Sequence, residues 1–271
     1  MGKERDYVLG THDAEVERLG LQHRIWRAKA LDAWRRAGFT VGQTLLDVGS
    51  GPGFASIDLA GMAGSEGRVI AVDRSHHFLE TLRERSAQQN VRNIQTFELD
   101  LDRDPLPALQ ADGAWARWVF SFVQEPRALL QKIHGALKPG GRLVLHEYMD
   151  YQTWKIAPRS EIFEEFVLTV MKSWRASGGE PDIAPSLAVW LRELGFEIRS
   201  TMPHIEVVGP SNFFWQWPKA FINTGADRLV EIGYLSVEKA AAIREAFEAA
   251  EANPNALVVT PAVLEIIAVR K

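Results

Sequence analysis

The chain has 271 residues, of which 46% are hydrophobic and 24% charged, and its net charge at pH 7 is −4. This composition is ordinary for a globular enzyme, and the acidic charge disfavours nucleic acid or an anionic membrane as the main partner, because both reward a basic face. Without a single cysteine, the chain can form neither a disulfide framework nor a thiolate metal site.

The N-terminal 20 residues are polar, and no run in the chain approaches the roughly 20 apolar residues of a membrane helix. We therefore expect a cytoplasmic protein with no signal peptide and no membrane partner. The expected partner is a small molecule, and the sequence leaves a homodimer open.

The first predicted element is a helix within residues 15–37, where apolar residues recur at helical spacing before Gly38. We expect residues 1–37 to form an N-terminal helical cap. Residues 38–147 then alternate strands and helices with short links, which is typical of a Rossmann-like, doubly wound parallel sheet. The predicted segments are Thr44–Val48, Ser56–Ala63, Arg68–Asp73, His77–Gln89, Ile94–Leu99, Gly113–Phe120, Arg127–Leu137 and Arg142–Glu147.

The pattern changes after residue 147. Two further strands, Phe196–Thr201 and Val263–Val269, complete the sheet within residues 148–271. Helices are predicted at Ser160–Trp174, Ser186–Gly195 and Val237–Ala252. Segments 148–180 and 209–256 interrupt the sheet, and we expect them to be cap or lid insertions. They are rich in aromatic residues, which predicts an apolar acceptor pocket beneath a lid.

A glycine-rich turn follows the first strand, in the order Asp47, Val48, Gly49, Ser50, Gly51, Pro52, Gly53. A dinucleotide fingerprint requires a third glycine at position 54, which is Phe54 here. The carboxylate of Asp47 would repel a pyrophosphate but suits a cationic sulfonium that carries an α-amino group. The loop therefore favours S-adenosylmethionine (SAM) over NAD.

Polar residues follow the next strands in turn. Asp73 ends the second strand, 26 residues after Asp47, where a carboxylate can accept both ribose hydroxyls. Asp100 ends the third strand and can accept the adenine amino group. Arg117, within an apolar run, requires an anionic partner, either the methionine carboxylate of the cofactor or a nearby Asp or Glu.

The segments LLDVGSGPG, RVIAVDRS, ELDLD, WARWVFSFVQEP and LKPGGRLVLHEY resemble class I SAM-dependent methyltransferases, over most of residues 44–147. The N-terminal segment is similar to that of small-molecule members with a helical cap. The resemblance implies a seven-stranded sheet whose last strand, Val263–Val269, is antiparallel. It implies these cofactor contacts: Gly49, Ser50, Gly51 and Gly53 at the methionine end, Asp73 on ribose, Arg74 beside the adenine, and Asp100 and Leu101 at the adenine.

Glu15, Arg18 and Gln22 share one face of the N-terminal helix. In relatives such a face covers the methionine end of the cofactor; a solvated polar face is the alternative.

We expect in-line methyl transfer from SAM to a small, largely apolar acceptor, with oxygen favoured and carbon or nitrogen open. A general base is optional, and His146, at the end of a strand, is the candidate, with a buried core histidine as the alternative. His12 and His23 lie on the N-terminal cap, and no metal site is predicted. The competing functions are an NAD(P)-dependent Rossmann oxidoreductase, a non-catalytic SAM-fold binding or dimerisation module, and a methyltransferase acting on protein.

Overall fold

The computed structural model describes residues 13–271. The helices are α1 (Asp13–Ala37), α2 (Phe54–Ala63), α3 (His76–Gln88), α4 (Pro126–Ala136), α5 (Glu161–Ala176), α6 (Ala184–Glu193), α7 (Gln216–Glu231) and α8 (Val237–Ala252). Short 3₁₀ turns occur at Tyr151–Thr153 and Phe213–Trp215. The strands are β1 (Thr44–Val48), β2 (Arg68–Asp73), β3 (Ile94–Glu98), β4 (Ala111–Arg117), β5 (Leu137–Asp150), β6 (Lys155–Ala157), β7 (Phe196–His204), β8 (Val207–Val208), β9 (Leu257–Val259) and β10 (Ala262–Arg270).

Seven strands form one sheet in the order β3-β2-β1-β4-β5-β10-β7. Strands β1 to β5 pair in parallel, whereas β10 pairs antiparallel with both β5 and β7. The predicted Rossmann-like sheet with an antiparallel last strand is therefore confirmed. The strand order reverses between β1 and β4, and ligands bind at such a switch point in α/β sheets.

Helices cover both faces of this sheet, because alternate residues along each strand point to opposite sides. Leu45 and Val144 pack with α1 and α2 on one face. Leu46 and Leu145 pack with α4 and α6 on the other. This two-sided burial explains the nearly continuous apolar runs that the sequence shows at the strands.

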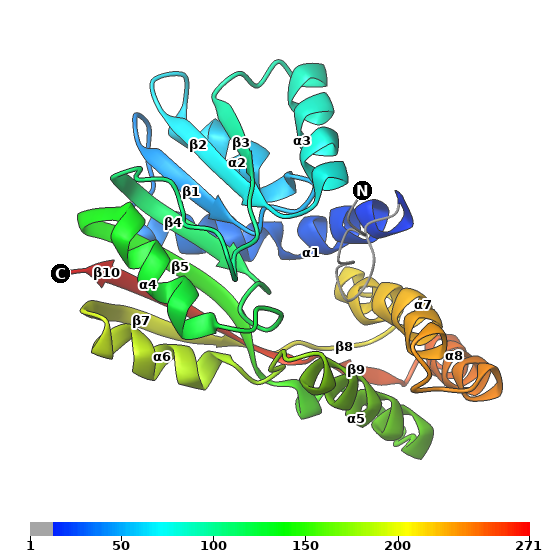
Figure 1. Cartoon of the computed structure of the whole chain (residues 1–271). Coiled ribbons are helices and arrows are strands. Elements are labelled where there is room, and N and C mark those ends of the chain that lie inside the picture. Colours follow the sequence, from blue (N-terminus) through cyan, green and yellow to red (C-terminus); the bar gives the residue numbers. More distant parts are fainter. Residues whose placement is uncertain (1–12) are drawn as a thin grey trace.

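The remaining elements form a cap at one end of the large sheet, beyond the end of β5, where α7 lies beside the start of α1 and α8 and α5 lie farther from α1 (Figure 1). The cap also contains a three-stranded sheet in the order β6-β9-β8, which was not predicted. Its core is aromatic and includes the fully or almost fully buried side chains of Trp154, Phe163, Phe166 and Trp215. Both interrupting segments thus contribute to one hydrophobic core, which also includes Trp26 of α1 and Trp118 after β4.

The boundaries differ from the prediction at the fourth strand. We expected a strand over Gly113–Phe120, but β4 ends at Arg117, and Trp118 takes a φ of 52°. A positive φ is uncommon for a bulky residue and does not continue a strand. His12 and the other residues before Asp13, including the start of the expected cap at 1–37, lie outside the described residues. Within residues 13–271, none of the helices is long and apolar enough to cross a membrane.

Candidate active site

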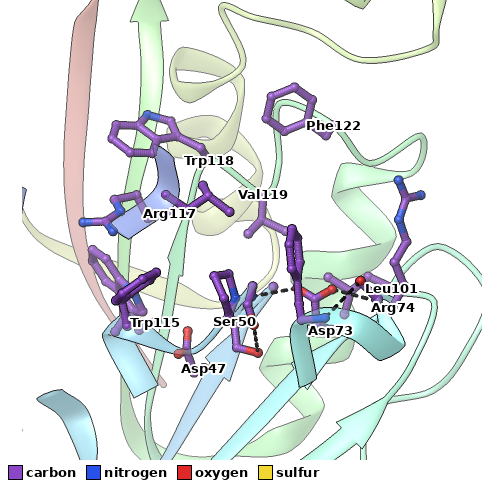
Figure 2. A pocket seen from close by; sticks show the side chains of 18 of the residues that line it. Asp47, Ser50, Asp73, Arg74, Leu101, Trp115, Arg117, Trp118, Val119 and Phe122 are labelled. Atoms are coloured by element: carbon purple, nitrogen blue, oxygen red, sulfur yellow. Dashed lines mark hydrogen bonds between the residues drawn. The ribbon is translucent and has the colours of Figure 1, made fainter. Parts of the chain in front are cut away.

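A pocket of about 1100 Å³, open solvent at its mouth included, lies at the carboxyl ends of β1, β2 and β4, against α1 and the start of α2. Figure 2 shows Asp73, Arg74 and Leu101 at one side of it and Asp47, Trp115 and Arg117 at the other, with Ser50 between them. Of the residues proposed to hold the cofactor, the lining includes Gln22, Asp47, Gly49, Ser50, Gly51, Asp73, Arg74, Asp100, Leu101 and Arg117. The position matches the switch point of the sheet.

The glycine loop forms the floor of the pocket. Gly49 and Gly53 have φ values of 66° and 80°, which side chains other than glycine rarely adopt. A Cβ on Gly49 would lie 2.5 Å from Val119 Cγ2, and one on Gly53 would lie 2.1 Å from Leu82 Cδ1. Gly53 does not line the pocket, so its expected cofactor contact is not seen; it allows the loop to pack against α3 instead.

Asp73 holds this loop against the end of β2. Its Oδ2 accepts a hydrogen bond from the Gly51 backbone N–H at 2.8 Å, and its Oδ1 accepts one from the Ser75 N–H at 2.9 Å. Each oxygen keeps a further lone pair, since a carboxylate has about four acceptor positions. Asp73 can therefore accept both hydroxyls of a ribose while it positions the loop.

Asp47 is buried at the other end of the pocket, and the Ser56 hydroxyl donates to its Oδ2 at 2.6 Å. Burial raises the pKa of Asp47 to about 7, against the opposing effect of the Ser56 hydrogen bond. A buried carboxylate of this kind favours a cationic ligand group, because a cation would restore its ordinary ionisation.

Arg117 provides the opposite charge on the same wall. Burial lowers the pKa of Arg117 to about 10, against the attraction of Asp47. Its Nη2 lies 3.2 Å from His23 Nδ1, whereas its buried Nη1 has no hydrogen-bond partner within residues 13–271. No carboxylate of these residues lies within ion-pair distance of the guanidinium, so the alternative of an Asp or Glu partner is not seen.

The end of the pocket beyond Asp73 is formed by residues that follow β2 and β3. Arg74 and Phe78 line it after β2, and Asp100, Leu101 and Asp102 line it after β3. The carboxylate of Asp102 is already engaged, because its Oδ1 accepts hydrogen bonds from the backbone N–H groups of Gln124 and Glu125 just before α4. Asp100 is thus the better placed of the two carboxylates for an exocyclic amino group.

The loop after β4 supplies the apolar wall, through Trp118, Val119 and Phe122. A buried carboxylate, Glu147, holds this loop: it accepts the backbone N–H groups of Val119, Phe120 and Ser121 at 2.7, 3.0 and 3.3 Å. Burial raises the pKa of Glu147 to about 7, against these hydrogen bonds. Glu147 therefore positions the loop after β4 without lining the pocket itself.

The polar face of α1 is buried, which argues against the solvated alternative. Arg18 pairs with Glu15 through two contacts of 2.7 Å and donates to Gln22 Oε1 at 3.0 Å. Trp217 Nε1 donates to the same oxygen at 3.3 Å, linking α1 to α7. Gln22 lines the pocket, whereas Arg18 is not among the lining residues and donates to Gln22 from behind it.

His146 does not line the pocket, contrary to the expectation that it faces the acceptor. It is fully buried between β10 and α1, with its Nε2 3.1 Å from Glu265 Oε2. Burial lowers the pKa of His146 to about 4, against the hydrogen bond with Glu265. The alternative of a buried core histidine is the one that the geometry supports.

Although no metal site was predicted, the ligand atoms of His146, His204 and Glu265 lie within 4.8 Å of one another. The histidines each hydrogen bond to Glu265 Oε2, and Arg36 donates to Glu265 Oε1. The guanidinium of Arg36 thus already supplies the positive charge that this carboxylate requires.

The aromatic residues of the cap also lie elsewhere than expected. Trp154, Phe166, Trp215 and Trp217 pack in the cap core and do not line the pocket. The aromatic lining comes from five residues beside the strand ends and the glycine loop: Phe54, Phe78, Trp115, Trp118 and Phe122. The sequence analysis did not assign these five residues, Leu19 or His23 to the pocket lining. Of the seven, only His23 had a signal in the sequence, because it lies next to Gln22 on the same helix.

Residues 46–145 match the protein family described as methyltransferase domain. A 2-phytyl-1,4-naphtoquinone methyltransferase of Nostoc punctiforme is 34% identical over 47% of this chain and 54% of its own length. A ubiquinone/menaquinone biosynthesis C-methyltransferase of Coxiella burnetii is 28% identical over 53% of this chain and 56% of its own length. The chain thus spans a little over half the length of these curated relatives.

Among solved structures, coclaurine N-methyltransferase bound to N-methylheliamine and S-adenosylhomocysteine (SAH) superposes with a TM-score of 0.58 at 15% identity. The match covers 90% of this chain and 72% of that one, so the shared fold includes the cap region. Residues 46–145 thus resemble a methyltransferase domain, and the superposition shows that the likeness in fold extends beyond this segment.

Proposed function

We propose that the protein binds SAM in this pocket and transfers its methyl group to a small, largely apolar acceptor. The observation that carries the proposal is the distribution of charge along the pocket. Asp73 suits a ribose at one end, while Asp47 and Arg117 at the other end suit the ammonium and the carboxylate of an amino acid. SAM joins these two parts in one molecule, whereas NAD would place a pyrophosphate near Asp47.

The chemistry requires little more than positioning. Methyl transfer from a sulfonium is an in-line displacement with a neutral leaving group, so no acid is needed. The acceptor atom must approach in line with the methyl group, and the apolar wall of Trp118, Val119 and Phe122 would exclude water from this region. The chain thus binds, orients and desolvates both reactants.

For the acceptor, we propose a flat ring of the quinone type in its reduced, hydroxylated form. The names of the two relatives support this class. Because the methyl group leaves SAM as an electrophile, the acceptor must be nucleophilic, and a quinone ring becomes so only after reduction. Oxygen remains our preference from the sequence, and carbon is the alternative that the Coxiella burnetii relative suggests.

The test is a turnover assay with SAM and a panel of reduced naphthoquinones and substituted phenols, followed by mass spectrometry. We expect SAH to form in step with an acceptor that has gained one methylene unit, and fragmentation identifies the methylated atom. The Asp73→Ala variant controls for background. Saturable SAM binding with no product from any acceptor would favour the non-catalytic binding module, and hydride transfer to or from NAD would favour the oxidoreductase.

A further inference from the structure

A chain of three polar side chains leads from α2 to the end of the pocket that we assign to the methionine moiety. Asp58 Oδ2 lies 3.0 Å from His23 Nε2, and His23 Nδ1 lies 3.2 Å from Arg117 Nη2. The three residues belong to α2, α1 and β4. His23 and Arg117 line the pocket, while Asp58 lies behind them.

The partners of His23 determine which ring nitrogen carries its proton. A guanidinium can only donate, so His23 Nδ1 must accept from Arg117. The proton is then on Nε2, which donates to the Asp58 carboxylate. Hydrogen bonds from His23 and Arg27 hold the pKa of Asp58 below its usual value despite burial. Burial in turn lowers the pKa of His23, outweighing the effect of Asp58, so the ring is neutral at pH 7.

This arrangement fixes one side of the Arg117 guanidinium and leaves the other side unused. Nη2 is engaged with His23, whereas the buried Nη1 has no partner within residues 13–271. A buried cation without an anion is costly, and a carboxylate bound there would recover that cost.

A purely structural role, in which these residues only attach α1 to α2, explains part of the network. Arg27 already makes this attachment, with contacts of 2.7 and 3.0 Å to Asp58. A structural role does not explain why His23 turns its second ring nitrogen to Arg117 inside the pocket, since that hydrogen bond adds nothing to the contact between α1 and α2.

We propose that Asp58 and His23 are positioning residues that orient Arg117 to bind the carboxylate of the cofactor's methionine moiety. The site would thereby select SAM and SAH over adenosine ligands that lack this carboxylate. The inference rests on the proposed function, because it assigns a role to each residue within the same cofactor pocket.

The test compares two ligands that differ at this end only: SAH, and 5′-methylthioadenosine, which lacks the amino-acid group. Their affinities are measured by isothermal titration for the wild type and for His23→Leu, His23→Gln and Asp58→Asn. We expect His23→Leu to weaken SAH binding about tenfold to a hundredfold, since it removes a hydrogen bond to a charged group. Binding of 5′-methylthioadenosine should be unchanged.

His23→Gln keeps a side-chain oxygen that can accept from Arg117, so it should recover part of the loss. Asp58→Asn should give a smaller loss in the same direction, and it serves as a second variant if His23→Leu folds poorly. Arg24→Gln is the matched control, because Arg24 is an exposed cation on the same helix. Its affinities for both ligands should equal those of the wild type.

A pH series provides a readout that a structural role would not produce. Protonation of His23 would place an N–H opposite the Arg117 guanidinium and lower SAH affinity. Because burial lowers the pKa of His23, this fall should come at a pH below 6.5, the ordinary pKa of histidine. The charged groups that face His23 are Asp58 on α2, Arg27 on α1 and Arg117 on β4. Asp47 also titrates near the ligand, but it does so equally in His23→Gln, which should lack the additional fall.

Two results would overturn the positioning role of Asp58 and His23 without affecting the proposed function. One is an unchanged SAH affinity in His23→Leu and Asp58→Asn, and the other is an equal loss of affinity for both ligands. If the wild type binds neither ligand, the proposed function itself is wrong, and so is the positioning role of Asp58 and His23.

Discussion

The pocket and the cap use their side chains in opposite ways. In the cap, large aromatic side chains such as Trp154, Phe163 and Phe166 are buried against one another, and none of these three lines the pocket. In the pocket, charged groups such as Asp47 and Arg117 are buried without complete partners. The abundance of aromatic residues therefore indicates a second hydrophobic core, whereas the charged residues at the strand ends indicate the binding site.

This difference predicts two separate kinds of variant. Truncation in the cap should lower the free energy of unfolding and leave ligand affinity unchanged. Substitution in the pocket should change ligand affinity much more than stability, because the ligand supplies hydrogen-bond and charge partners that these groups lack in the free protein. The variants below test whether the two regions are in fact independent.

The largest effect is expected in the cap core. Phe166→Ala removes a side chain with no exposed surface and should lower the free energy of unfolding by about 3–5 kcal/mol. Thermal and denaturant unfolding measure this loss, and SAH titration at a temperature where the variant is folded should give the wild-type affinity. Leu168→Ala, at an exposed position of the same helix, is the control and should cost little. A parallel loss of SAH affinity in Phe166→Ala would show that the cap and the pocket are coupled.

The next largest effect is expected at Asp73. Loss of two hydrogen bonds to a charged acceptor, each worth roughly 1.5–3 kcal/mol, should weaken SAH binding in Asp73→Ala by about two to four orders of magnitude. Asp73→Asn should lose less, since its amide oxygen can still accept from one backbone N–H. Glu66→Ala, an exposed acid beyond the pocket, is the control. An Asp73→Ala variant with wild-type affinity would show that the carboxylate does not touch the cofactor.

A third comparison separates crowding from backbone strain in the glycine loop. Gly53→Ala adds a Cβ that would lie 2.1 Å from Leu82 Cδ1 at a φ of 80°. Gly42→Ala has a similar φ of 83°, but nothing lies within 4 Å of its added Cβ. We expect Gly53→Ala to cost about 1–3 kcal/mol more than Gly42→Ala in unfolding experiments. Equal costs would mean that α3 moves away from the loop without penalty.

The smallest effect concerns the pH dependence of stability. The pKa of His146 is about 4 in the folded protein, against an ordinary value of 6.5. The unfolded chain therefore binds more protons between these values, and stability should fall as the pH decreases, by about 1.4 kcal/mol per pH unit. Asp47 and Glu147, whose pKa values are raised to about 7, contribute in the opposite sense.

The measurement is therefore a difference between proteins. Unfolding of the wild type and of His146→Gln is followed from pH 7 to pH 5, and the wild type should lose more stability over this range. Parallel curves would mean that His146 has the same pKa in the folded protein as in the unfolded chain.

Local sequence patterns predicted the elements that carry the pocket. The strand Thr44–Val48, the glycine loop and Asp73 could be placed because a strand, a turn and a helix follow one another within a short segment. The strand order around the pocket followed from the resemblance rather than from these residues. The three strands of the small sheet have only two or three residues each, too few for a periodic pattern.

Contacts between distant segments could not be read from the sequence. His23 and Asp58 are 35 residues apart, and His23 and Arg117 are 94 apart, so nothing in the sequence indicated that the three side chains meet. His146 was assigned to the pocket because it ends a strand, but alternation along β5 turns its side chain towards Glu265. The positive φ of Trp118, which ends β4 early, likewise depends on the surrounding fold.

The central claim is that this pocket binds SAM and its product, and it is tested most directly by isothermal titration of the wild type with SAH and with NAD. Saturable binding of SAH at one site, with no heat from NAD, is the result that the charge distribution of Asp47, Asp73 and Arg117 predicts. Saturable binding of NAD with no binding of SAH would contradict the account and return the chain to the oxidoreductases.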